Sequence, residues 1–509
     1  MWFSDQFEKW NFDRSQWYMV HEEVAKIKCI PSFQKEKGKG KLILVTAMSP
    51  TPAGEGKTTT VIALTDALNK LNYDAMATLR QPSVGPVFGK KGGATGGGMA
   101  SVVPHDRIDL GLSGDFYSVE NANNMIAALI DNHIFHQLEP KLSSTILWKR
   151  CLDMNDRSLR SYNTPQGERG FVITAASELM AILSLSKSFK DLKERIGNCV
   201  LAVDTNGNFI RAKDLNFHKA ATVLMRDAFY PNLVKTLENN PVIMHAGPFA
   251  NIAQGTSSIV GTKLATHLAD FVVTEAGFGA ELGAEKFFNI KCRGSELEVA
   301  CTVIVATSRA IEAHGFENLL IHIENLKKFG TSVVVCLNKF DGDSVNDLLI
   351  IKSKLNEQGI QCEVSEGFEK GSLGTLELAK RVVEAANPSH IRYTYDLNDT
   401  IENKINLIAT QIYRAKNVEW SSEAKEKCSL YKEYAHLPIC MAKTPLSIQD
   451  DSKHVFVKNE HTLHIRDFKL QAGAGFIVPL TGSIQLLPGL AKDPRALSVD
   501  LSDNGEILW

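Results

Sequence analysis

Short apolar runs, separated by polar or glycine-containing turns, recur through most of the 509-residue chain. Such runs are typical of buried strands, and the clearest are KLILVTA (41–47), PVIMHAG (241–247), DFVVTEAG (270–277), TVIVAT (302–307) and SVVVCLNKF (332–340). Between them, VIALTDALNKL (61–71) and the stretch that follows FVIT (171–174) have the spacing of amphipathic helices. This alternation predicts an α/β fold with a parallel sheet.

The length of the chain suggests two to four domains. Aromatic residues fall near helical spacing at the N-terminus, which predicts an aromatic-rich helical extension over residues 1–40. We expect a nucleotide-binding and catalytic core over residues 41–350. A small α/β domain over 351–435 and a mixed C-terminal domain over 436–509 complete the expected organisation.

Composition excludes several classes of protein. The formal net charge of −2 provides no strong positive field, so we expect neither nucleic acid nor membrane as a partner. No apolar run approaches the length of a membrane span, and acidic residues among the first aromatics argue against a secretory signal. The nine cysteines are scattered without any C-x-x-C spacing, as is typical of reduced thiols. We therefore expect a cytoplasmic protein.

TPAGEGKTTT (51–60) directly follows the first apolar run and precedes a predicted helix. A strand that delivers a glycine-rich turn onto a helix N-terminus presents backbone N–H groups to phosphate, as in a P-loop. Lys57 is placed to reach the β- and γ-phosphates as a catalytic residue, and Thr58 to bind Mg²⁺. Thr51 stands where the consensus P-loop has glycine. The predicted nucleotide-binding residues are Thr51, Pro52, Ala53, Gly54, Glu55, Gly56, Lys57, Thr58 and Thr59.

Arg80 and a glycine-rich run follow the predicted strand DAMATL (74–79). Residues 85–98 contain seven glycines, with Lys90 and Lys91 among them, so they form neither a good helix nor a good central strand. Arginine offers a planar fork of N–H donors that suits a carboxylate or an acyl phosphate. We therefore favour an anion-binding active-site loop, with Arg80 as a catalytic residue, over an inert structural loop.

Other polar residues stand at the carboxyl ends of the predicted strands, where ligands gather in parallel sheets. They are His245, Glu275, Thr307 and Asn338.

The chain resembles the formate–tetrahydrofolate ligase family, also called 10-formyltetrahydrofolate synthetases. The resemblance runs from about residue 40 to the C-terminus, in the family's order. It rests on TPAGEGKTTT, RQPSVGPVFGKKGGATGGG, LDMNDRSLR, PNLVKTLE, GPFANIAQG, VVTEAGFGAELGAEKFFNIKCR, ATSRAI, HIENLKKFG, LPICMAKT and AGAGFIVPLTGSI followed by LPGL.

The resemblance implies a P-loop NTPase-like parallel-sheet core with two smaller α/β or α+β domains, and a homo-oligomer, either a dimer or a tetramer. It implies that ATP and Mg²⁺ convert formate to formyl phosphate, which then formylates tetrahydrofolate. A monovalent cation, K⁺ or NH₄⁺, is a further implied cofactor. Arg80 matches the arginine at the formate position, Asp115 the catalytic aspartate that ends the family's T-G-D, and Asn338 a residue near the nucleotide.

Departures from the family concentrate on the expected folate side. Gly111 and Tyr117 replace two histidines around Asp115, and Gln254 replaces a third. Histidine titrates near neutral pH, so these changes remove proton-transfer capacity. Phe368 stands where a folate-stacking Trp is expected, and phenylalanine offers a smaller ring face without an N–H.

Two alternatives to an active ligase remain open. One is a diverged nucleotide-binding paralogue that lacks ligase activity or phosphorylates another small carboxylate, which the lost histidines would explain. The other is a GTPase, because NKFD (338–341) matches the N-K-x-D that reads guanine.

Overall fold

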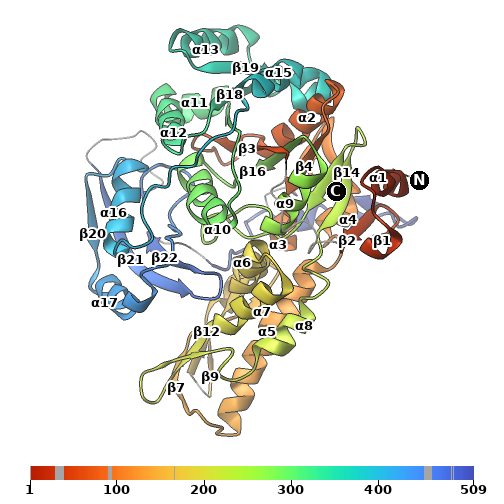
Figure 1. Ribbon diagram of the computed structural model, residues 1–509. Coiled ribbons are helices and arrows are strands. Elements are labelled where there is room, and N and C mark those ends of the chain that lie inside the picture. Colours follow the sequence, from red (N-terminus) through yellow and green to blue (C-terminus); the bar gives the residue numbers. More distant parts are fainter. Residues whose placement is uncertain are drawn as a thin grey trace.

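A computed structural model describes residues 2–28, 39–89, 95–165, 167–451, 461–482, 484 and 486–509. A 12-stranded sheet crosses the centre of the molecule, with smaller sheets around it (Figure 1). The order of its main path is β1-β2-β14-β15-β4-β16-β3-β17-β18-β19. In that order the strands are Trp17–His21, Val24–Ile27, Asn232–Thr236, Pro241–Met244, Ala75–Leu79, Phe271–Glu275, Lys41–Ala47, Cys301–Ala306, Val333–Asn338 and Gln361–Ser365; β5 (Gly96–Gly97) and β6 (Ala100–Val103) branch from β14.

From β15 to β19 every pairing along this path is parallel. These strands are apolar on both faces, as expected where helices cover the two sides of a sheet. The predicted strands at 41–47, 241–247, 270–277, 302–307 and 332–340 are confirmed as β3, β15, β16, β17 and β18. The protein is thus a mixed α/β protein with a large, mostly parallel central sheet.

The N-terminal segment differs from the predicted helical extension. Helix α1 covers only Trp2–Lys9, and β1 and β2 then add an antiparallel hairpin to the sheet edge. The aromatic residues do not line one face of a single long helix, as their spacing predicted. Their rings pack together from separate elements, a helix and a strand. Phe7 of α1 stacks on Trp17 of β1 at 4.2 Å between ring centroids.

Strand β19 also lies where a separate small domain was expected. It falls within residues 351–435 but pairs in parallel with β18 as the last strand of the central sheet. Cys362 is buried and Val364 is partly buried, so one face of this short strand packs on the apolar core of the protein.

Helices cover the sheet and build two further lobes (Figure 1). Their bounds are α1 Trp2–Lys9, α2 Lys57–Lys70, α3 Val84–Phe88, α4 His105–Asp109, α5 Asp115–Phe135, α6 Glu178–Leu185, α7 Phe189–Asn198, α8 His218–Leu224, α9 Ile259–Leu268, α10 Arg293–Ser295, α11 Ser308–His314, α12 Phe316–Lys328, α13 Val345–Glu357, α14 Gly367–Lys370, α15 Leu376–Ala385, α16 Ile401–Gln411 and α17 Ser422–Leu430.

One lobe groups α5 to α8 with a three-stranded sheet, and the other groups α16 and α17 with a second three-stranded sheet (Figure 1). The first sheet is β13-β12-β7 (Phe209–Arg211, Val200–Asp204, Leu142–Ile146), and the second is β20-β21-β22 (Asn417–Trp420, Thr462–Gln471, Phe476–Thr481). Two-stranded sheets pair β8 (Arg150–Leu152) with β11 (Phe171–Ile173), β9 (Tyr162–Thr164) with β10 (Gly167–Arg169), and β23 (Asp500–Leu501) with β24 (Ile507–Leu508).

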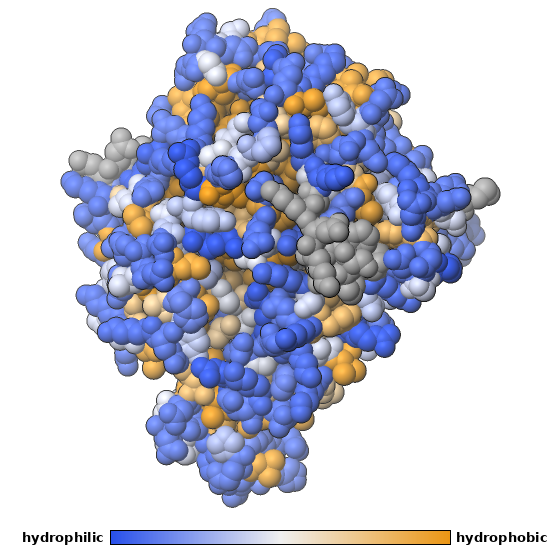
Figure 2. All heavy atoms as spheres, viewed as in Figure 1, coloured by the Kyte–Doolittle hydropathy of each residue, from blue (hydrophilic) through white to orange (hydrophobic). Residues whose placement is uncertain are grey.

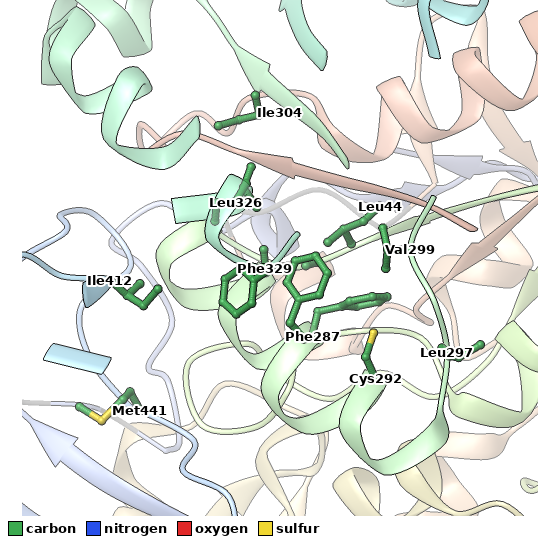
Figure 3. Packing of buried hydrophobic residues seen from close by; sticks show 14 of the residues in the cluster. Leu44, Phe287, Cys292, Leu297, Val299, Ile304, Leu326, Phe329, Ile412 and Met441 are labelled. Carbon is green, nitrogen blue, oxygen red and sulfur yellow. The ribbon is translucent and has the colours of Figure 1, made fainter. Parts of the chain in front are cut away.

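The largest apolar cluster joins the central sheet to the C-terminal lobe. Leu44 of β3, Phe287 and Phe329 meet in its interior (Figure 3), and full burial of such side chains contributes roughly 1.5–3 kcal/mol each. Hydrophilic side chains cover most of the face in Figure 2, with small apolar patches between them. Within the described ranges, no helix is both long and apolar enough to cross a membrane.

Candidate functional site

The loop over residues 48–56 carries the chain from the end of β3 to the first turn of α2. Gly54 and Gly56 adopt φ angles of 80° and 78°, in the left-handed region that glycine enters without strain. Gly56 caps α2, and a Cβ at this position would collide with the side-chain amide of Asn338. Lys57 is the first residue of the helix. The predicted strand–loop–helix arrangement is confirmed, and it is the geometry in which helix N-termini bind phosphate.

Glu55 braces this loop from inside, because its side chain is buried. One carboxylate oxygen accepts hydrogen bonds from Thr51 N at 2.6 Å and Thr51 Oγ1 at 2.7 Å. The other accepts from Thr307 Oγ1 at 2.5 Å, directly after β17. Thr51, which replaces the consensus glycine, therefore fixes Glu55 across the entrance of the loop.

Asn338, the last residue of β18, is held against the same loop. Its Nδ2 donates to the Glu55 carbonyl at 3.1 Å. Arg309 donates to the Gly54 carbonyl, and its guanidinium lies 3.8 Å from the centre of the Phe340 ring. The Asn338 amide is thus engaged by the loop backbone, which argues against a role in reading guanine.

Glu275, the last residue of β16, joins two of the predicted site residues. Its Oε2 accepts a hydrogen bond from Thr58 Oγ1 at 2.8 Å, and its Oε1 lies 3.5 Å from Arg80 Nη2. Arg80 Nη1 donates to the Pro248 carbonyl at 3.1 Å. The buried Arg80 Nε has no hydrogen-bond partner in the part of the chain that the structure describes. One carboxylate thus connects the hydroxyl predicted for Mg²⁺ with the guanidinium predicted for formate.

A cavity of about 500 Å³ opens beside Thr58, Arg80 and Glu275. Side chains of Gln81, Asn155 and Asn251 line it, and each carries a buried oxygen without a hydrogen-bond partner among the described residues. Such oxygens are available to a ligand that carries N–H or O–H groups. The apolar part of the wall comprises Pro82, Pro86, Val87, Phe249, Phe278 and Pro488. Apolar walls with a few directed polar groups are typical of small-molecule sites.

Asp115 lies behind this cavity and does not line it. Its Oδ1 accepts from Lys26 Nζ at 2.7 Å, and its Oδ2 from Gln81 Nε2 at 2.5 Å and Asn232 Nδ2 at 2.8 Å. Burial acts to raise the pKa of Asp115, but the Lys26 ammonium and these hydrogen bonds hold it below its usual value. Ser113 Oγ also donates to Oδ1 at 3.0 Å, so each oxygen of this carboxylate accepts two hydrogen bonds and has no lone pair left for a substrate. Asp115 instead fixes the orientation of the Gln81 side chain. The Gln81 amide nitrogen is bonded to Asp115, and its amide oxygen is left for a ligand in the cavity.

Of the four residues predicted from strand ends, three meet at the loop and one does not. Glu275, Thr307 and Asn338 contact residues of 51–58, as described above. His245 is buried between Ser258 Oγ and the Ala228 carbonyl, both at 2.7 Å from its ring nitrogens. Burial lowers the pKa of His245 to about 4. This histidine is therefore neutral and structural.

Phe368 projects from the short helix α14 over the end of the glycine-rich run. The side of its ring approaches Gly97, where an added Cβ would come within 2.9 Å of it, and its carbonyl accepts from Met99 N at 2.8 Å. Half of the residue is exposed, so part of its ring is available to a stacking partner. Lys90 and Lys91 lie outside the described residues.

The three positions that lack the family histidines do not gather around the cavity, since none of them lines it. Tyr117 is 73% exposed, whereas Gln254 is fully buried with both amide atoms unpartnered within the described chain. Gly111 has a φ of 108°, so a histidine there would be strained in this backbone.

Two oxygen ligands suited to a small divalent cation meet at the first turn of α2, namely the Thr58 hydroxyl and the Glu275 carboxylate. Mg²⁺ favours oxygen donors and keeps several of its waters, so it needs few protein ligands. The described residues contain no group of three or more His, Cys, Asp and Glu side chains arranged for a metal. The side chains present therefore fit a P-loop Mg²⁺ site better than an all-protein metal site.

Sequence reasoning missed a buried ionic group beneath the loop, centred on Glu281 of the π-helical turn Ala280–Ala284. Glu281 lies 3.3 Å from Lys443 Nζ and 3.8 Å from His322 Nδ1, and His322 Nε2 is 3.2 Å from Ser49 Oγ. All four residues are fully buried. Charged residues are ordinarily exposed, so the local pattern gave no signal for this arrangement. It ties the loop entrance to the C-terminal part of the chain.

Comparison with known proteins gives one consistent result. A family described as formate–tetrahydrofolate ligase matches residues 4–508. A formate–tetrahydrofolate ligase from Thermotoga maritima is 46% identical over 498 residues, which cover 92% of each chain. The ligase from Campylobacter concisus is 45% identical over 96% of this chain and 94% of its own. The ligase from Fervidobacterium nodosum is 47% identical over 92% and 90%.

Proposed function

Because the chain belongs to the formate–tetrahydrofolate ligase family, we propose that the loop of residues 48–56 and the adjoining cavity form its active site. The enzyme ligates formate to tetrahydrofolate with ATP. The observation that most directly supports this site is the Glu275 carboxylate, which contacts both Thr58 of the loop and Arg80 of the cavity. The γ-phosphate of an ATP bound at the loop would therefore lie next to a formate bound beside Arg80 in the cavity.

In the first step, a formate oxygen attacks the γ-phosphorus of ATP, the bond to the β–γ bridging oxygen breaks, and ADP leaves. The product is formyl phosphate. Lys57 and the N-terminal amides of α2 hold the phosphates. Arg80 orients formate and stabilises the charge that develops on the transferring group. Its unpartnered Nε and the fork of its terminal nitrogens provide the donors.

In the second step, the N10 amine of tetrahydrofolate attacks the formyl carbon. The carbon–oxygen bond to phosphate breaks, phosphate leaves, and N10 releases its proton to give 10-formyltetrahydrofolate. The unpartnered oxygens of Gln81, Asn155 and Asn251 can accept hydrogen bonds from N–H groups in the cavity. Phe368 offers a half-exposed ring for stacking.

Thr58 and Glu275 are the residues that would hold Mg²⁺. The Thr58 hydroxyl donates its hydrogen bond to Glu275, so the lone pairs of the hydroxyl oxygen remain available to a cation. A bound Mg²⁺ would neutralise phosphate charge during the transfer. A monovalent cation, K⁺ or NH₄⁺, completes the proposed set of cofactors.

We assign Asp115 a positioning role and not a catalytic one, because it orients Gln81 from behind the cavity. The parallel part of the sheet, with the loop at its centre, is the proposed P-loop NTPase-like core. The lobes around β12 and β21 are then the two smaller domains. We further propose a homo-oligomer, a dimer or a tetramer, on the resemblance to the family.

One assay tests the proposed site and reaction. Purified enzyme is mixed with ATP, formate, tetrahydrofolate and Mg²⁺, and 10-formyltetrahydrofolate is followed by absorbance after acid conversion. Product formation should require all four components. ATP binding without tetrahydrofolate binding, measured by calorimetry, would favour the diverged paralogue instead.

A further inference from the structure

A second cavity, of about 280 Å³, lies where the α5–α8 lobe meets the C-terminal sheet. Residues from α5, the end of β7, the start of α6, α17 and β21 line it, and none of them lines the first cavity. The two lobes that meet here are visible below and to the left in Figure 1. The cavity is thus separate from the loop of residues 48–56 and has no part in the reaction described above.

Two lysines of this cavity lack a counter-ion. Neither Lys149 nor Lys469 has a side-chain hydrogen bond or ion pair within the ranges that the structure describes, although both line the cavity. The third lysine, Lys427, is already neutralised by Asp467 at 2.6 Å and Glu423 at 3.1 Å. The cavity wall therefore carries positive charge that the surrounding described side chains balance only in part.

Glu178 supplies only part of the missing charge, because its carboxyl is partly protonated near neutral pH. Its Oε1 accepts hydrogen bonds from Gly473 N at 2.7 Å and Ala474 N at 3.2 Å, and burial raises its pKa to about 7. Burial, together with the nearby Lys149 charge, lowers the pKa of Lys469 to about 8. Lys469 is half-buried and Lys149 is exposed at the rim of the cavity. A bound anion would compensate the Lys469 ammonium, which is the more desolvated of the two, and the Lys149 charge beside it.

The floor of the cavity is apolar. It includes Trp148, whose indole N–H already donates to the Asn123 carbonyl at 3.1 Å, so only its ring surface is available. The remaining apolar lining comprises Ile146, Leu147, Val172, Val200, Phe468 and Leu470. A ligand that satisfies this cavity combines one anionic group with a compact apolar body.

We propose that this second cavity is a binding site for a small organic carboxylate, whose anionic group pairs with Lys149 and Lys469 and whose apolar body rests against Trp148. The site lies outside the catalytic cavity, so its occupant is neither formate nor the folate that reacts. The proposal does not depend on the assignment of the catalytic residues.

Benzoate is the probe for this proposal, with benzamide as its uncharged analogue of the same shape. Binding is measured by calorimetry and by the change in tryptophan fluorescence, in the presence of saturating ATP and formate. Benzoate should bind under these conditions, and benzamide should bind at least tenfold more weakly. Lys149→Met/Lys469→Met should weaken benzoate at least tenfold while ligase activity stays unchanged. Lys425→Met, an exposed position on α17, is the matched control and should leave benzoate affinity unaltered.

A pH series adds an independent readout. Lys469 is charged below a pKa of about 8, and Glu178, with a pKa of about 7, becomes a negative charge in the same cavity as pH rises. Asp467 and Lys427 also face the cavity but are paired with each other. Both titrations disfavour an anion at higher pH, so benzoate affinity should be highest below pH 7 and fall as pH rises through 8. Equal affinity of benzoate and benzamide would overturn the proposal, as would an unchanged affinity in the double variant. Displacement of benzoate by formate would place the binding in the catalytic cavity and would overturn it too. The proposal is also overturned if no binding is detected at benzoate concentrations of tens of millimolar.

Discussion

Thr58, in the first turn of α2, donates a hydrogen bond of 2.8 Å to Glu275, 217 residues further along the chain. The second carboxylate oxygen of Glu275 faces the Arg80 guanidinium at 3.5 Å. Glu275 is nearly buried, and neither lobe contributes to this group. Two neighbouring parallel strands and the first turn of α2 therefore set the relative positions of the groups proposed to hold Mg²⁺ and formate.

Glu275→Gln should lower kcat by about 10²-fold, because Arg80 loses its counter-charge and an amide N–H can face the guanidinium in its place. The expected readout is a lower kcat with a higher KM for formate and for Mg²⁺. Glu324→Gln breaks an exposed pair with Arg414 and serves as the control. Normal turnover in Glu275→Gln would exclude the proposed role of this carboxylate.

Lys57→Ala should reduce ATP-dependent turnover by 10²-fold or more, on the order of the loss of one electrostatic donor in a transition state. The fold should remain, since Lys57 lies on the loop side of α2 and is not part of an apolar cluster. Lys70→Ala, at the other end of the same helix, should be close to normal. If the circular dichroism spectrum of Lys57→Ala showed an unfolded protein, the loss of activity could not be assigned to the missing phosphate contact.

Arg80→Lys should impair the rate severely, because lysine cannot reproduce the two-donor fork toward a carboxylate or an acyl phosphate. We expect kcat to fall by about 10²-fold and the affinity for ATP to remain nearly unchanged. Arg107→Lys on the exposed side of α4 is the matched control. Equal weakening of ATP binding would place Arg80 on the nucleotide.

Phe368→Trp should increase the affinity for tetrahydrofolate several-fold, because a larger ring face adds on the order of 1 kcal/mol of stacking. ATP affinity should not change. Calorimetric titration with each ligand checks this. Phe135→Trp, at the exposed end of α5, controls for the effect of an added surface indole. Unaltered folate affinity would mean that Phe368 does not contact the pterin.

Asp66→Asn should stabilise the protein above neutral pH. Asp66 is buried in α2, where burial raises its pKa to about 7 from 3.8, although Thr236 and Asn240 donate to it. The folded state therefore favours the protonated form, and the stability that this contributes is present below pH 4 and lost as pH rises through about 7. The free energy of unfolding of the variant should exceed that of the parent by roughly 2–4 kcal/mol at pH 8. Denaturant unfolding at pH 5 and pH 8 provides the comparison; a difference that is the same at both pH values would contradict it.

The elements that could be predicted from sequence were those whose pattern is local. β3, the loop and α2 follow one another within residues 41–70, so apolar periodicity and two glycines were sufficient to identify them. Glu275, Thr307 and Asn338 could be placed at the same edge because strand ends converge in a parallel sheet.

What could not be predicted depends on pairing between distant segments. The apolar residues of β2 are compatible with several partners, and only the assembled sheet shows that β2 pairs with β14. The same holds for Asp115, whose family resemblance indicated catalysis. Its burial by Lys26, Gln81 and Asn232 is a tertiary property without a local sequence signal.

The Lys26–Asp115–Asn232 connection also has a kinetic consequence. Its contacts join residues separated by 89 and 117 positions, and contacts of such long sequence separation form slowly because large loops must close first. Gln81 acquires its orientation only when these three segments have met. The loop depends on still longer separations, because Glu55 contacts Thr307 and Asn338 across 252 and 283 positions. Loop and substrate-binding wall should therefore both mature late in folding, so that an intermediate able to bind nucleotide has already joined β3 to β17 and β18.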